Sequence, residues 1–349
     1  MARRTTPTVR EAVDAYRDSR RHLALNTRNN DKSCLDRMAR SVGPDRQIGN
    51  ITAQQVQDFF REFDGQAPAS WNKAKQRVTG FLSYAQRQQW VAGDLVADVA
   101  KKKVPRRERV RLQPDELVTL VDQPVDPRDS AFLSVAVNTG LRSSEVCSLR
   151  LRDIDLENGR MYIYRQKTQQ ADTLTITPAL RTRLEAWLAF YRNELAFNAF
   201  GKDGKQVEDL ELAGDMHLFP ARGQDGRQYD HTPGHVGFGS LRPWSPISRP
   251  HCIVQRAMSA MGFDVVRQEG LHTVRRSVAR CLFEHASEQG YDNSLRVVAA
   301  LLGHQSTQTT EGYIGVTHDR QKRDALMATD FLPWAETAEV IPIREVQAF

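Results

Sequence analysis

The stretch LLGHQSTQTTEGYIG, residues 301–315, decides how the second half of this sequence is interpreted. An apolar helix over Val297–Leu302 is expected to end at Gly303, because glycine readily adopts the left-handed conformation that closes helices. His304, a run of hydroxyl side chains and Tyr313 then follow. Taken alone, the stretch indicates a helix end, a polar turn and a surface tyrosine. Polar residues elsewhere in the chain must therefore establish whether it has any other role.

The composition is that of a globular protein with room for two hydrophobic cores. The chain has 349 residues, of which 40% are hydrophobic and 26% are charged, and two domains are normal at this length. No run of 18 apolar residues is present and no apolar segment follows the basic start, so neither a membrane span nor secretion is expected. The four cysteines lie far apart, which favours free thiols in a reducing cytoplasm over disulfides or a zinc site.

Positive charge is concentrated in the first third of the chain. Residues 1–112 contain 23 Lys and Arg against 12 Asp and Glu, a net charge of +11, whereas the remainder has 26 against 31, a net charge of −5. A basic domain of this kind suggests a polyanionic partner, most simply nucleic acid. A solvated basic surface explains the same charge almost as well.

Residues 1–100 have the pattern of a small domain of four helices. Capping boxes at Thr8–Glu11 and Thr52–Gln55 mark two helix starts, each followed by an apolar stripe. Further apolar stripes run through residues 34–42 and 71–85. The basic residues on the opposite face of the fourth helix are Lys73, Lys75, Arg77 and Arg87. Contact with DNA phosphates and simple solubility of the helix surface explain these side chains equally well.

Residues 101–113, KKKVPRRERVRLQ, are predicted to form an extended linker. The segment has seven basic residues, one acidic residue and no hydrophobic period. A linker with this much positive charge is expected to lie along the phosphate backbone of DNA. The alternative is a solvated linker that makes no specific contact. The residues expected to contact DNA here are Lys101, Lys102, Lys103, Arg106 and Arg107.

A mainly α domain with a small antiparallel β-sheet is expected over residues 114–330. A helix around Ser130–Asn138 precedes a hairpin signal, in which strand-like residues 161–165 and 173–176 follow a tight Asn-Gly turn. Residues 198–250 are rich in Gly, Pro and charge, and they are predicted to be a long insertion with a short strand at HLFP. Further helices complete the domain.

Two motifs of this domain carry polar residues that a hydrophobic core does not need. NTGLRSSEVCS places Arg142 between two helices and Glu145 in the first turn of the second, where a carboxylate is favoured. GLHTVRRS places His272 and Arg275 three residues apart on one side of a helix, near an N-terminus that suits an anion. Arg276 points further around that helix and is expected to contact solvent or a DNA backbone.

Together with the histidine and tyrosine of residues 301–315, the polar residues follow the order Arg, His-x-x-Arg, His-x8-Tyr. This order, with TGLRSSE, HTVRRS and LLGH…Y, resembles the tyrosine recombinase, or phage integrase, family. The resemblance covers about Pro114–Asp330, which corresponds to an α+β catalytic domain in that family. The four helices before it are similar to the family's core-binding domain. The resemblance implies a site-specific recombinase or integrase acting on double-stranded DNA.

The resemblance also implies a chemical role for each polar residue. Tyr313 would attack the scissile phosphate, forming a 3′-phosphotyrosyl link and releasing a 5′-hydroxyl. Arg142 and Arg275 would grip the nonbridging oxygens with two planar forks. Lys167, at the turn of the predicted hairpin, would be the general acid; Arg165 competes for that role but lies within a strand.

Three supporting assignments follow from the same resemblance. His272 would accept the proton of the tyrosine, His304 would donate a hydrogen bond to the phosphate, and Glu145 would orient one of these groups.

Because the phosphotyrosyl link conserves the energy of the broken bond, no cofactor is expected. No metal site is expected either.

Assembly and location are likewise implied by the resemblance. The family implies a homotetramer on specific DNA recombination sites. It also implies a protein encoded by a bacterium or phage and associated with the nucleoid in a bacterial cytoplasm. Accessory factors can set the direction of recombination. Residues 331–349 form a tail that could dock in trans on a neighbouring subunit or fold back in cis. Two other functions stay open: relaxation of DNA by a type IB topoisomerase-like reaction, and non-catalytic DNA binding on the same fold.

Overall fold

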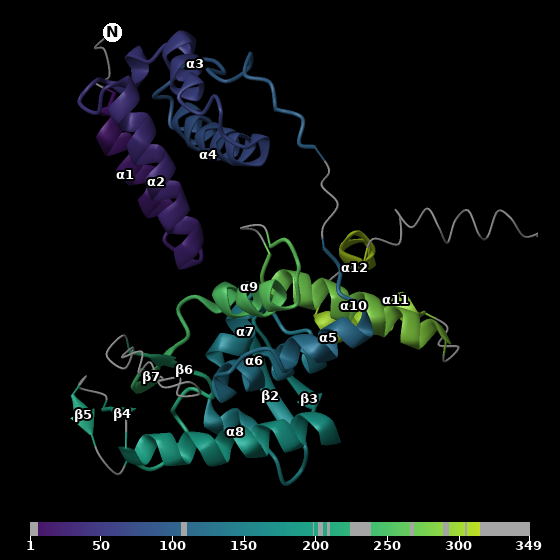
Figure 1. Ribbon diagram of the computed structural model, residues 1–349. Helices are drawn as coiled ribbons and strands as arrows, with labels where there is room; N and C mark the ends of the chain where they lie inside the picture. Colours follow the sequence, from purple (N-terminus) through teal and green to yellow (C-terminus); the bar gives the residue numbers. More distant parts are fainter. Residues whose placement is uncertain are drawn as a thin grey trace, which may run out of the picture. The chain divides into compact units, whose positions relative to one another are not determined.

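The computed structural model of the chain divides into two compact units, residues 1–108 and residues 109–349. The structure describes residues 6–105, 110–197, 199–201, 205–207, 210–223, 239–265, 269–288, 293–303 and 306–314. Most elements are helices and the sheets are small, which confirms the predicted mainly α class (Figure 1). All four cysteines are free thiols, as expected. Among the described helices, none is both long enough and apolar enough to cross a bilayer.

Two helices of the first unit begin at the predicted capping boxes, and the other two contain the predicted apolar stripes. They are α1 (Val9–Ser19), α2 (Leu25–Val42), α3 (Ala53–Arg61) and α4 (Pro68–Arg87), with a short 3-10 turn at Ile48–Asn50. At the start of α1, Glu11 N donates to Thr8 Oγ1 at 3.2 Å and Thr8 N donates to the Glu11 carboxylate at 2.8 Å, so the predicted capping box is present. The apolar stripes meet in a single core around Leu35, Phe59 and Phe81.

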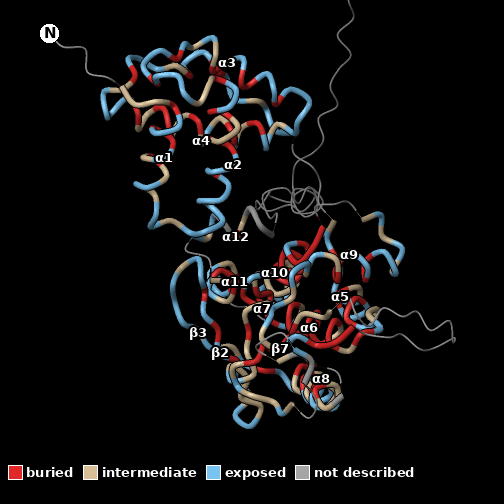
Figure 2. Tube along the Cα trace, turned by 90° about the vertical axis from the view of Figure 1, so that its left-hand side faces the viewer, coloured by how far each residue is buried: buried red, intermediate tan, exposed pale blue. Residues whose placement is uncertain are grey.

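The second unit is built around the helix that carries the HTVRRS motif. Its helices are α5 (Pro114–Val121), α6 (Pro127–Thr139), α7 (Ser143–Ser148), α8 (Pro178–Phe197), α9 (Pro250–Ala260), α10 (Leu271–Glu288), α11 (Ser294–Leu302) and α12 (Thr307–Ile314). Helix α10 packs against α5, α6, α9, α11 and α12 (Figure 1). Its residues 273–279 are therefore buried on every side, and α6 and α10 form the most continuously buried part of the unit (Figure 2).

The predicted hairpin forms one edge of a three-stranded antiparallel sheet. Its strands are β1 (Ile154–Asp155), β2 (Arg160–Arg165) and β3 (Gln170–Thr175), in that order. Gly159 has φ +63° in the turn before β2, which is the conformation that the Asn-Gly signal predicts. Side chains of β2 alternate strictly, with Met161, Ile163 and Arg165 buried and the residues between them exposed. An arginine thus occupies the third inward-facing position of this strand.

A second sheet lies within the segment that was predicted to be an insertion with one strand. Its strands are β4 (Ala199–Phe200), β5 (Gln206–Val207), β6 (Pro220–Arg222) and β7 (Leu241–Pro246), in the order β5-β4-β7-β6. The predicted strand at HLFP is displaced, because β6 begins only at Pro220. Leu218, Phe219 and Leu241 are buried in the core of the unit. Strands of two to six residues separated by polar segments leave too weak a period to be recognised in the sequence.

Candidate active site

The site begins at the junction between α6 and α7. Gly140 ends α6 in the left-handed conformation, with φ +60°, and the chain then enters α7 at its N-cap residue, Arg142. A side chain at position 140 would stand 3.2 Å from the side chain of Leu302, so glycine also permits close packing against α11. This junction directs the arginine away from the core and towards the end of α11.

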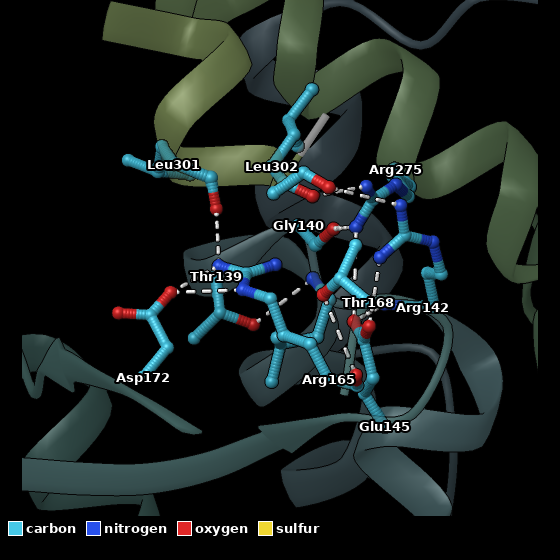
Figure 3. Close-up of polar contacts among 12 residues, drawn as sticks. Thr139, Gly140, Arg142, Glu145, Arg165, Thr168, Asp172, Arg275, Leu301 and Leu302 are labelled. Atoms are coloured by element: carbon cyan, nitrogen blue, oxygen red, sulfur yellow. Dashed lines mark hydrogen bonds and ion pairs between the residues drawn. The ribbon is translucent and has the colours of Figure 1, made fainter. Parts of the chain in front are cut away.

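Glu145 links two arginines from distant parts of the chain. It is 2% exposed, and its carboxylate accepts from Arg142 N and from Arg142 Nη1, both at 2.8 Å. Arg275 Nη1 lies 4.0 Å from the same carboxylate (Figure 3). A buried carboxylate beside two guanidinium groups compensates part of their charge and restrains their orientation.

Arg275 is held by main-chain carbonyl groups as well. The residue is 2% exposed in the middle of the packed part of α10. Its Nη1 donates to Gly140 O and its Nη2 donates to Leu302 O, each at 2.6 Å (Figure 3). The guanidinium therefore joins the end of α6 to the end of α11, and the fork is fixed before any ligand binds.

Two further arginines donate to the same end of α11. Arg142 Nη2 lies 3.4 Å from Gly303 O, and Arg165 Nη2 donates to Leu301 O at 2.8 Å. Gly303 closes α11 with φ +61°, as the sequence predicts. Carbonyl groups at a helix C-terminus carry partial negative charge, which favours cations there. Together with Arg275, three arginines thus surround one helix end and form a site suited to an anion with several oxygens.

The hairpin places its two basic residues in opposite environments. Arg165, at the end of β2, is buried and donates from Nε and Nη2 to Asp172 Oδ2, at 2.8 and 2.7 Å. Lys167 lies in the turn at residues 166–169 and is exposed. The lysine therefore stands at the exposed tip of the hairpin, whereas the arginine, in the last strand pair before the turn, lies on the buried face.

The remaining site residues lie on α10 and α12 or outside the described residues. His272 is exposed near the start of α10. Tyr313 lies in α12, which packs against α10 and α11, and its side chain is outside the described part of the structure. His304 is also outside the described residues. The structure therefore brings Arg142, Glu145 and Arg275 together and places the helix of the tyrosine beside them.

The residues expected to contact DNA fall into four groups. The exposed ones are Lys73, Arg87, Lys101 and Lys103. Those with partners inside the first unit are Lys75, Arg77 and Lys102, bonded respectively to Val99 O, Asp31 and Asp64. Arg106 and Arg107 lie outside the described residues. The surface position expected for Arg276 is wrong: it is 7% exposed and donates to Val110 O at 2.9 Å, because the end of the predicted linker packs over α10.

Arg165 and its partner Asp172 are the site residues that sequence reasoning did not identify as a pair. The alternation of β2 indicated that Arg165 is buried, since residues 161 and 163 are apolar and position 165 lies on the same face of the strand. A buried arginine requires a compensating partner. Because that partner lies on the opposite strand and the third contact is a main-chain carbonyl, residue types alone did not reveal the arrangement.

Two other potential nucleophiles near these elements are suppressed by burial. Burial raises the pKa of the Cys147 thiol in α7 to about 11, so very little thiolate forms at neutral pH. Burial also raises the pKa of the Tyr191 phenol in α8, whose hydroxyl donates to His217 O at 3.2 Å. Neither side chain is suited to attack an electrophile in the described state.

Substituting the shared carboxylate is expected to destabilise the second unit. Glu145→Gln keeps the shape of the side chain but leaves the neighbouring guanidinium groups without their buried counter-charge, so the free energy of unfolding should fall by about 3 kcal/mol. Urea unfolding followed by circular dichroism measures the change. Glu185→Gln is the matched control: Glu185 lies 3.1 Å from Arg181 in an exposed pair on α8, and its loss should cost less than about 1 kcal/mol. Equal effects of the two changes would contradict the buried role of Glu145.

Comparison with known sequences supports one family. The model of the phage integrase family matches residues 110–209. An integrase/recombinase of Escherichia coli is 24% identical over 282 residues, covering 78% of this chain and 79% of the relative. The tyrosine recombinase XerC of Xanthomonas axonopodis pv. citri is 26% identical over 233 residues, covering 64% of this chain and 59% of the relative.

Solved structures share the fold. A lambda integrase dimer bound to a COC′ core site matches with a TM-score of 0.61 at 18% identity, covering 88% of this chain and 95% of that one. The Tn1549 transposon integrase in complex with circular intermediate DNA matches with a TM-score of 0.62 at 12% identity, covering 93% and 100%. The family match over residues 110–209 and the integrase and XerC relatives support the phage integrase family, the tyrosine recombinases, and the solved structures show that the chain has the fold of these integrases.

Proposed function

We propose that the chain is a site-specific DNA recombinase that cleaves and rejoins duplex DNA through a 3′-phosphotyrosyl link at Tyr313. The observation that carries the proposal is the convergence of Arg142 and Arg275 on Glu145 and on the end of α11. Two oriented guanidinium forks can bind both nonbridging oxygens of a phosphodiester. Because the forks are held in advance, little reorganisation accompanies the build-up of charge on phosphorus.

The proposed cleavage step is a transesterification. The Tyr313 phenol oxygen bonds to phosphorus while the bond from phosphorus to the 5′ oxygen breaks. His272 accepts the phenolic proton, and Lys167 donates a proton to the departing 5′ oxygen. A tyrosine ordinarily has a pKa near 10, and the positive charge of Arg142 and Arg275 would favour its phenolate form in the transition state. Reversal with a 5′-hydroxyl from another strand completes the exchange.

Charge and structural relatives support duplex DNA as the partner. Residues 1–112 carry the net charge of +11, and the exposed lysines and arginine of α4 and the linker are candidate phosphate contacts. The lambda and Tn1549 integrases of similar fold were solved on DNA. A lambda integrase tetramer bound to a Holliday junction has the same fold, with a TM-score of 0.61 at 18% identity. We therefore propose that this chain also acts as a homotetramer on two DNA sites.

Trapping on a library of nicked duplexes tests the proposal. Each duplex carries a nick a few bases from a randomised segment, so that a short fragment diffuses away after cleavage and leaves the covalent adduct. Protease digestion followed by mass spectrometry should find the DNA on the peptide that contains Tyr313, attached through its 3′ end. Sequencing of the trapped DNA should recover a consensus site.

Three outcomes would contradict the proposal. DNA attached to a different peptide, or through its 5′ end, would refute the assigned nucleophile and polarity. Trapping with no sequence preference would instead support a topoisomerase-like relaxation activity, and no adduct on any duplex would support non-catalytic binding.

A further inference from the structure

Three consecutive carbonyl groups at the end of α11 each accept a hydrogen bond from a different arginine. Leu302 O accepts from Arg275 and Gly303 O accepts from Arg142, the two residues of the proposed phosphate clamp. Leu301 O accepts from Arg165, which has no role in the chemistry proposed above. The helix end is therefore shared between the clamp and the hairpin (Figure 3).

Arg165 is anchored on three sides. It is 2% exposed, and two of its nitrogens hold Asp172 on the facing strand. A side chain at Gly303 would stand 2.5 Å from Arg165 Nη1, so the guanidinium lies directly against the glycine that ends α11. A planar fork can reach Asp172 and Leu301 O at once, whereas a lysine at this position offers only one point charge.

The turn that carries Lys167 begins directly after this anchor. Thr168 N donates to Arg165 O at 3.1 Å, so the arginine also closes the turn at residues 166–169 through its own main chain. Any shift of Arg165 relative to Leu301 would move the tip of the hairpin by a similar amount. Displacements of about 1 Å are enough to cost on the order of 100-fold in rate at a reacting centre.

We infer that Arg165 is a positioning residue that fixes the Lys167 hairpin to the end of α11, and so sets the distance between the general acid and the arginine clamp. The inference rests on the proposed function, in which the Lys167 ammonium gives its proton to the 5′ oxygen as the bond from phosphorus to that oxygen breaks. Arg165 itself does not act as the acid, because a guanidinium does not release its proton in proteins and this group is buried and paired with Asp172.

A sulfur substitution in the DNA separates this role from a general effect on folding. When sulfur replaces the bridging 5′ oxygen, the leaving group is a thiolate. Because an ordinary thiol has a pKa near 8.5, the thiolate is stable enough to depart without receiving a proton from a general acid. Single-turnover cleavage of nicked oxygen and sulfur substrates is measured with the same preparation of each variant. The ratio of the two rates is then independent of the fraction of protein that is folded.

Four proteins are compared: the unaltered chain, Arg165→Lys, Lys167→Ala and Arg160→Lys. Lys167→Ala should cleave the oxygen substrate about 10²- to 10⁴-fold more slowly and recover on the sulfur substrate. Arg165→Lys should be about 10- to 100-fold slower on the oxygen substrate and within about 3-fold of the unaltered chain on the sulfur substrate. Arg160 is exposed at the other end of β2, so Arg160→Lys should leave both rates unchanged.

Each of the other results would overturn the inference in a distinguishable way. An equal loss for Arg165→Lys on both substrates would mean that the arginine supports the clamp or the fold, and an unchanged rate on oxygen would mean that it positions nothing. If sulfur fails to rescue Lys167→Ala, the hairpin carries no acid to position, although transfer to Tyr313 would still stand. Absence of any adduct from the unaltered chain on both substrates would refute the proposed function itself.

Discussion

Tyr313→Phe is expected to abolish formation of the covalent adduct on nicked DNA. The change removes a single hydroxyl, which the proposed reaction requires as the attacking group. Removal of a nucleophile from an enzyme that forms a covalent intermediate typically costs several orders of magnitude, so a loss of at least about 10⁴-fold is expected. Denaturing gel electrophoresis of the trapped product measures it, with a parallel gel-shift titration showing that the DNA affinity is retained.

A second tyrosine serves as the control for this experiment. Tyr164 of β2 is 56% exposed and lies on the strand of the hairpin without belonging to the proposed chemistry. Tyr164→Phe removes the same hydroxyl and should leave the adduct yield unchanged. If the adduct survives in Tyr313→Phe and disappears in the control variant, another phenol is the nucleophile and the placement of α12 beside α10 has no catalytic meaning.

Arg275→Lys is expected to slow cleavage by about 10²- to 10³-fold while leaving DNA affinity nearly unchanged. The lysine keeps the positive charge but loses the fork that is oriented by Gly140 O and Leu302 O. Loss of one oriented donor to a developing oxyanion costs about 3–4 kcal/mol in comparable enzymes. DNA affinity comes mostly from many phosphate contacts over the duplex, so one buried residue contributes little to it.

The burial of Arg275 makes a stability control necessary. Urea unfolding shows how much folded protein remains under the conditions of the assay, and the rate is corrected for that fraction. Arg183→Lys is the matched substitution, since Arg183 Nη1 pairs with Asp122 at 2.8 Å elsewhere in the second unit, and its cleavage rate should not change. A parallel loss of cleavage and DNA affinity in Arg275→Lys would show that this arginine anchors the duplex and does not stabilise the transition state.

Much of the local structure could be predicted because it depends on contacts within a few residues. The capping box at Thr8, the turn at Gly159 and the helix end at Gly303 all follow from side-chain geometry and backbone freedom at single positions. The second sheet could not be predicted, because its short strands pair across intervals of the chain that have no repeating pattern. Arg276 was assigned to the surface for a related reason: helical spacing did not show that the segment at Val110 covers it.

The sequence by itself indicated the class of the fold, several helix boundaries and the hairpin, and it supplied the polar residues that are proposed to carry out the chemistry. These features depend on residue type, spacing and local backbone preference. Only the tertiary structure decided that Glu145 lies between Arg142 and Arg275, and that the hairpin is joined to α11 through Arg165. Glu145 is close to Arg142 in the chain, but its contact with Arg275, the contacts of Arg142 and Arg165 with the end of α11, and that of Arg275 with the end of α6 link residues more than a hundred positions apart. Most of these long-range contacts end on main-chain carbonyl groups, which every residue possesses. Contacts with main-chain carbonyl groups therefore leave no pattern of residue types from which they could be predicted.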